Sequence, residues 1–174
     1  MADRAPANQG RLKRVLRHLF APSARRLFPA DRLTRIAAAI TASELRHTGE
    51  ICFAVEPSLR PRAAWAGTQA RERAAEVFAQ LGVWDTRANN GVLLYLLLAD
   101  HRIEIVADRG LDGRVSASQW HEVCGRIEER LRAGQVEAAA IDGVTCISRL
   151  LGDHFPPRDG GGDINELQDR PQLL

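Results

Sequence analysis

The stretch from Asn89 to Arg114 constrains the fold of this chain more than any other part of the sequence. It contains an unbroken apolar run, Val92–Leu98, then Ala99-Asp100-His101, then a second apolar segment, Ile103–Ala107. The first run is too short to cross a membrane and too rich in aliphatic residues for an exposed strand. It therefore predicts a strand that helices cover on both faces. The residues between the two runs predict a tight hairpin turn.

A further strand before this hairpin sets the topology. It is the segment ICFAV between Glu50 and Glu56, and Pro57 ends it. The strand–helix–strand unit from Glu50 to Leu98 predicts a right-handed crossover with two parallel strands. Apolar residues at helical spacing predict helices at residues 11–20, 30–46, 68–81, 116–134 and 136–151. Residues 57–67 are expected to form a loop. We therefore predict an α/β protein, a three-layer α/β/α sandwich whose small mixed sheet combines a β-α-β crossover with a β-hairpin.

Length and composition divide the chain into three parts. A chain of 174 residues predicts a single domain, which we place at residues 29–156. Residues 1–28 are a basic segment with a short amphipathic helix, and the Gly-, Asp- and Pro-rich residues 157–174 are expected to be a disordered tail. We find no run that is apolar enough to span a membrane and no apolar core of a secretory signal. A cytoplasmic location is the expectation.

The sequence contains no motif of an activated nucleophile. A nucleophile elbow, a P-loop and a dinucleotide-binding glycine motif are all missing, and each His stands alone in the chain. Cys52, Cys124 and Cys146 lie apart in apolar surroundings, which predicts buried reduced thiols rather than a disulfide or a zinc site.

Acidic residues are predicted to gather at one edge of the sheet. Parallel strands begin at the same edge, and the antiparallel third strand ends there. The topology thus brings together Glu44 and Glu50, the loop 85–90, and the exit at Asp108, with Asp112 nearby. Oxygen ligands select hard cations such as Ca²⁺ or Mg²⁺. Two alternatives are open: the carboxylates are solvated loop ends, or Arg109 neutralises them internally.

The basic helix near the N-terminus has three possible roles. Leu12, Val15, Leu16, Leu19 and Phe20 form an apolar stripe, and the remaining faces carry Arg11, Lys13, Arg14 and Arg17. Such a helix can lie on an anionic membrane surface, contact nucleic acid, or pack on the domain with its Arg residues in water. Nucleic acid is not expected, since no aromatic residues alternate with the basic ones. Membrane contact would make the protein peripheral to the inner membrane.

Three segments of the chain resemble the TPM-domain family, in its soluble bacterial branch. They are FPADRLTRIAAAITASELRHTGEICFAVEPSL, AAEVFAQLGVWDTRANNGVLLYLLLADHRIEIVADRGL and the final helix end LLGDHFP. The resemblance covers residues 28–156 and implies an α/β/α sandwich, an acidic pocket for divalent cations, calcium in some members, and an acid phosphatase activity. By resemblance the metal ligands are Glu50, Asp85, Asn90 and Asp108, with Glu44 and Asp142 as outer candidates. The chain departs from the family at Asp108-Arg109-Gly110, where many members carry Thr-Gly or Ser-Gly.

Function is narrowed to three hypotheses. The favoured one is a non-catalytic or weakly catalytic interaction domain that binds Ca²⁺ or Mg²⁺ and acts with membrane-associated partners, of the LemA type by analogy. The alternative is a metal-dependent acid phosphatase that uses the same acidic pocket. A third is a membrane-surface protein whose basic helix is its working part. Whether the chain is an enzyme is left open.

Overall fold

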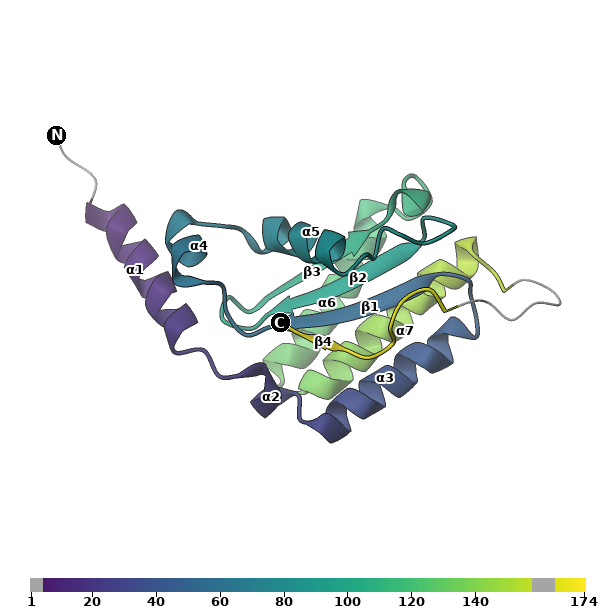
Figure 1. Cartoon of the computed structure of the whole chain (residues 1–174), viewed down its shortest axis with the longest axis horizontal. Helices are drawn as coiled ribbons and strands as arrows, with labels where there is room; N and C mark the ends of the chain where they lie inside the picture. Colours follow the sequence, from purple (N-terminus) through teal and green to yellow (C-terminus); the bar gives the residue numbers. More distant parts are fainter. Residues whose placement is uncertain (1–4, 158–164) are drawn as a thin grey trace.

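The computed structural model describes residues 5–157 and 165–174 and contains one mixed sheet between two layers of helices (Figure 1). The strand order is β3-β2-β1-β4. The elements are α1 (Ala5–Leu19), α2 (Ala24–Leu27), α3 (Ala30–Glu44), β1 (Glu50–Glu56), α4 (Pro61–Ala66), α5 (Ala70–Gln80), β2 (Gly91–Leu97), β3 (Arg102–Ala107), the 3₁₀ turn η1 (Arg109–Leu111), α6 (Ala117–Arg132), α7 (Val136–His154) and β4 (Gln172–Leu173).

The predicted crossover and hairpin are both confirmed. β1 pairs with β2 in parallel, and β2 pairs with β3 in the antiparallel sense, so that Leu94 lies between Phe53 and Ile105. Every residue of β1 and β2 is buried. The turn between β2 and β3 passes through His101, whose φ of 51° lies in the left-handed region.

Alternating side chains of the central strands enter two separate cores. Ile51, Phe53, Leu94 and their neighbours pack against α3, α6 and α7 on one face of the sheet. Cys52, Tyr95 and their neighbours pack against α4 and α5 on the other face. Because both faces are covered, the strands read as continuous apolar runs rather than as an alternating pattern. The three-layer α/β/α architecture follows from this arrangement.

The N-terminal part of the chain differs from the prediction in three places, one of which is the short helix α2, at residues where no helix was predicted. α1 begins at Ala5, whereas the predicted helix begins at residue 11. α4 occupies part of the expected loop 57–67; Pro61 stands in its first turn, where the missing N–H costs no hydrogen bond, and Gly67 ends it in the left-handed conformation. Among the described residues, no helix is both long enough and apolar enough to cross a membrane.

The C-terminal part differs as well. α7 continues past Gly152 to His154 and ends before Pro156 and Pro157. The predicted disorder of residues 157–174 is wrong for the end of the chain, because Gln172–Leu173 forms β4 beside β1. Without β4, the outer edge of β1 would leave backbone groups unpaired, and a short added strand satisfies them. Residues 158–164 of the predicted tail lie outside the described residues.

Candidate cation site at the acidic edge of the sheet

The predicted convergence of strand ends is confirmed at the backbone level. Glu50 begins β1 directly beside Gly91 of β2, and the Asp108 N–H donates to the Gly91 carbonyl at 2.9 Å. The Asn90 side-chain amide donates to the Thr48 carbonyl at 2.7 Å. Three of the four predicted ligands, Glu50, Asn90 and Asp108, therefore surround one strand entry. We refer to Glu44, Glu50, Asn90, Asp108 and Asp169 as the acidic edge.

Glycine at position 91 makes this close arrangement possible. A Cβ at Gly91 would lie 2.0 Å from the Val83 carbonyl oxygen. Only a residue without a side chain lets the loop after α5 lie this close to the strand. That loop then carries Thr86, whose hydroxyl accepts from the Asn90 N–H at 3.0 Å and fixes the strand entry.

Two oxygens at the acidic edge are buried and have no hydrogen-bond partner. Asn90 is 1% exposed, and its Oδ1 has none. Asp108 is 8% exposed; its Oδ1 accepts from the Arg109 N–H at 2.7 Å, but its Oδ2 has no partner. A buried acceptor without a partner costs about 1–3 kcal/mol. Such atoms are exceptional in native proteins and call for a ligand, an ion or a water molecule.

Carboxyl groups from distant parts of the chain meet at the start of β1. Glu44 ends α3, and its Oε1 accepts from the Ile51 N–H at 3.2 Å. Burial raises the pKa of Glu44 to about 8; the Ile51 hydrogen bond opposes this, and the carboxylates of Glu50 and Asp169 add to it. Asp169 also hydrogen-bonds the Thr41 hydroxyl. Glu44 thus holds a proton at neutral pH that a cation could displace.

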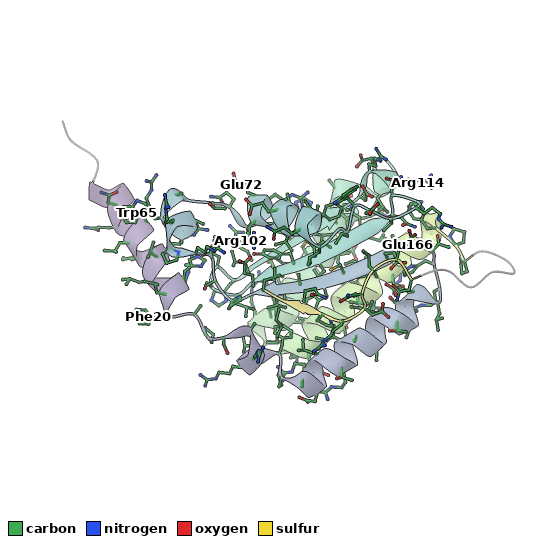
Figure 2. All side chains as sticks on the ribbon, viewed as in Figure 1. Phe20, Trp65, Glu72, Arg102, Arg114 and Glu166 are labelled. Carbon is green, nitrogen blue, oxygen red and sulfur yellow. The ribbon has the colours of Figure 1, made fainter. Side chains whose placement is uncertain are left out.

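The C-terminal segment lies across the acidic edge. The Glu50 carboxylate accepts from the backbone N–H groups of Glu166, at 3.1 Å, and Leu167, at 3.3 Å. The carboxylate of Glu166, which Figure 2 labels, in turn accepts from the Arg87 N–H at 3.0 Å. The segment is therefore held at both sides. A cation that reaches Glu50 must share this carboxylate with the segment or displace it.

Sequence reasoning missed Asp169 and Glu166 because they belong to the stretch that was expected to be disordered. No periodic apolar pattern marks residues 165–171. The only available signal was the apolar pair at the end of the chain, Leu173-Leu174, which suits a strand.

Two predicted participants, Asp85 and Asp142, lie elsewhere, and Arg109 does not have the role considered for it. Asp85 is exposed in the loop after α5. Asp142 pairs with Arg130 of α6 at 2.8 Å, and its position on α7 is about 20 Å along the helix from the end that meets the acidic edge. The ion-pair alternative for Arg109 is wrong: within the described part of the chain its guanidinium bonds Asn89 Oδ1, at 2.9 Å, and no carboxylate.

The donor set at this edge consists of oxygen atoms. Among residues 5–157 and 165–174, no three His, Cys, Asp or Glu side chains lie close enough together to hold a metal ion by themselves. A cation here would need the Asn90 amide oxygen or backbone carbonyls beside the carboxylates. Ca²⁺ accepts such mixed oxygen ligands in flexible geometry, and Mg²⁺ would retain several water molecules.

Comparisons with known proteins agree with the fold. The model of a family described as the TPM domain matches residues 24–150. The NMR structure of the BA42 protein from the psychrophilic bacterium Bizionia argentinensis is 26% identical, with a TM-score of 0.74, over 84% of this chain and 95% of that one. The N-terminal domain of a protein from P. gingivalis shares 19% identity, with a TM-score of 0.61, over 78% of this chain and 85% of that one. The search of curated proteins found no match.

Proposed function

The chain belongs to the TPM domain family, and on that premise we propose that it is an interaction domain that binds a divalent cation, Ca²⁺ or Mg²⁺, at the acidic edge. The observation that carries the proposal is the pair of buried oxygens without partners, Asn90 Oδ1 and Asp108 Oδ2. Both are good ligands for a hard cation, and they belong to adjoining strand ends that hydrogen bonds hold in place.

The charges around these oxygens support the same proposal. Burial of Glu44, together with the neighbouring carboxylates of Glu50 and Asp169, favours its neutral form. A divalent cation reverses that preference, because it stabilises the ionised carboxylates. Binding to the folded state alone would also stabilise the fold by mass action.

Binding is favoured over phosphatase chemistry because the described residues of this region offer no activated nucleophile. The nearest cysteine in the sequence, Cys52, is buried, and burial raises the pKa of its thiol to about 12. Such a thiol stays protonated at neutral pH and does not attack phosphate. The carboxylates and the amide of the acidic edge can hold a cation without any further group.

A calcium and magnesium titration tests the proposal. Isothermal calorimetry and backbone amide shifts are recorded while CaCl₂ or MgCl₂ is added to the full chain. We expect shifts centred on Glu50, Asn90 and Asp108, and a melting temperature that rises with the cation and falls again with EDTA. Asp108→Asn should abolish both effects. Glu129→Gln, an exposed carboxylate on α6, is the matched control and should bind like the parent protein.

Two results would contradict the proposal. If titration with both cations gives no heat, no amide shifts and no stabilisation, no cation binds at the acidic edge. Equal loss of binding in Asp108→Asn and in Glu129→Gln would show that cation binding depends on the net charge of the protein rather than on the residues of the acidic edge. Hydrolysis of p-nitrophenyl phosphate that depends on the cation and is lost in Asp108→Asn would favour the phosphatase alternative instead.

A further inference from the structure

Helix α1 packs on the domain through its polar face. Asp100 in the turn between β2 and β3 accepts from Arg14 at 2.7 Å, from Arg17, and from His18 Nε2 at 3.1 Å. His18 Nδ1 accepts from the Leu59 N–H at 3.0 Å, so the ring proton resides on Nε2 and the imidazole is neutral. Burial lowers the pKa of His18, in keeping with this state.

The Asp100 contacts are strong enough to fix the orientation of the helix. Burial alone would raise the pKa of Asp100, but hydrogen bonds from Arg14 and Arg17 outweigh burial and lower it to about 2. Arg14 also donates to the Ala64 and Thr68 carbonyls at 3.3 and 2.6 Å, which ties α1 to α4. Charge-assisted hydrogen bonds of this kind hold a definite geometry.

Four of the five residues of the apolar stripe of α1 consequently face away from the domain, whereas Val15 is half-buried and packs against the core that α4 and α5 cover. The exposed fractions are 52% for Leu12, 44% for Leu16, 57% for Leu19 and 81% for Phe20. An amphipathic helix usually buries such a stripe in its own core, so this orientation is the reverse of the packing alternative. Figure 1 shows α1 at one end of the molecule, and Figure 2 shows Phe20 directed away from the sheet.

Positive charge surrounds this stripe. The exposed basic residues of α1 and α2 are Arg11, Lys13, Arg17, Arg25 and Arg26, and residues 8–29 contain no Asp or Glu. A second copy of the chain would bring two such basic rims against each other and be repelled. An anionic surface with an apolar interior complements both the stripe and the charges.

An apolar pocket adjoins the stripe where α1 ends. It has a volume of about 860 Å³; Phe20, Leu27, Leu98, Leu131 and Val136 line it, and Arg102 and Arg132 are among its basic residues. Phe20 thus belongs to both features. Asp100 and Glu128 also line the pocket, so its polar part carries charges of both signs. Its apolar part suits the acyl chain of a lipid.

From this geometry we propose that the apolar stripe of α1 and the adjoining pocket dock the protein onto an anionic phospholipid bilayer. The stripe enters the boundary between headgroups and acyl chains, and Arg11, Lys13 and the α2 arginines contact the anionic headgroups. β1 spans about 20 Å between this end of the sheet and the acidic edge. A docked protein therefore presents the acidic edge to the solvent, accessible to a cation or a partner.

Vesicle co-sedimentation tests the docking with three variants of the full chain. Vesicles of phosphatidylcholine with phosphatidylglycerol are compared with vesicles of phosphatidylcholine alone. We expect the parent protein to pellet with the anionic vesicles only, and less so as salt rises. Leu16→Ser with Leu19→Ser should weaken binding about tenfold or more, since it removes exposed apolar area. Arg11→Gln with Lys13→Gln should weaken it about fivefold for each charge, from about 1 kcal/mol per basic residue.

The matched control is Leu45→Ser, which removes an equally large exposed leucine at the end of α3. It should bind like the parent protein. Melting curves check that each variant is folded; should the double leucine variant melt early, the exposed charges Arg11 and Lys13 still test the proposal. Absence of binding, equal binding to neutral vesicles, or loss of binding in Leu45→Ser would overturn it. A dimer that the double leucine variant abolishes would assign the stripe to a second copy instead and overturn it as well.

Discussion

Glu44→Gln should stabilise the protein increasingly as the pH rises from 4.5 to about 8, and leave its stability unchanged in acid. Glu44 lies at the end of α3 beside the Glu50 and Asp169 carboxylates, and burial is the main cause that raises its pKa from 4.5 to about 8. Glutamine has the shape of the protonated acid and retains an oxygen for the Ile51 N–H, which Glu44 now bonds at 3.2 Å. The substitution therefore keeps the hydrogen bond and removes the ionisation.

The sign and the size follow from proton linkage. Below pH 4.5 both the folded and the unfolded chain carry a protonated Glu44, and the group is neutral to stability. Between pH 4.5 and about 8 only the unfolded chain releases the proton, so the folded state loses stability as pH rises. The raised pKa of Glu44 sets an upper limit of about 5 kcal/mol on the free energy of unfolding that is lost, since each pH unit between the two pKa values contributes about 1.4 kcal/mol. Glu44 is partly exposed, and solvent screening reduces our expectation to about 2 kcal/mol at pH 8.5.

Urea unfolding of the parent protein and of Glu44→Gln from pH 4.5 to pH 8.5 measures this difference. The two free energies of unfolding should coincide at the acid end and separate by about 2 kcal/mol at the alkaline end. Millimolar Ca²⁺ should reduce the separation if the cation binds the ionised edge. Glu129→Gln, on the exposed face of α6, is the control and should show no such trend. Parallel pH profiles, or a variant that is less stable at pH 8.5, would refute the assignment of a raised pKa to Glu44.

Three further predictions concern the core. Gly91→Ala should lower the free energy of unfolding by about 3 kcal/mol, since the new Cβ would lie 2.0 Å from the Val83 carbonyl oxygen. Urea unfolding measures this loss, and a loss below about 1 kcal/mol would show that the loop moves aside freely. Leu94→Ala should cost about 2–5 kcal/mol, and the β2 amides should exchange slowest with deuterium; fast exchange of those amides would contradict the central position of β2. Tyr95→Phe should cost about 1–3 kcal/mol, because the buried Tyr95 hydroxyl donates to Glu56 at 2.6 Å, and an unchanged denaturation midpoint would show that this bond contributes nothing net.

Strand polarity made part of the acidic edge predictable. The apolar run of β2 and the return of β3 required a hairpin, and the crossover required β1 and β2 to begin at the same edge. Glu50, Asn90 and Asp108 flank those strand ends in the sequence, so their meeting followed from topology alone. Asp85 was grouped with them by loop position, yet a loop residue is not bound by the strand register, and the structure leaves it exposed.

The pairing of α1 and of the C-terminal segment could not be predicted in this way. The spacing of Leu12, Leu16 and Leu19 predicts an amphipathic helix, but the same pattern suits packing with either face toward the domain. Asp100 decided the outcome: it is distant in sequence and is brought to α1 only by the hairpin turn. β4 depends likewise on an edge of β1 that exists only once the sheet has formed.

Local sequence pattern and chain connectivity were enough to predict the elements that make up the sandwich. Continuous apolar strands must be covered on both faces, and parallel neighbours need a helical crossover, so the sandwich and the common edge follow from local pattern and chain connectivity. Tertiary structure alone decided which charges are buried together and which apolar surface stays in water. Glu44 is buried beside Asp169, and the stripe of α1 faces outward, because of contacts between segments that are far apart in the sequence. Their energies depend on distance and burial, which hydrophobic periodicity does not encode.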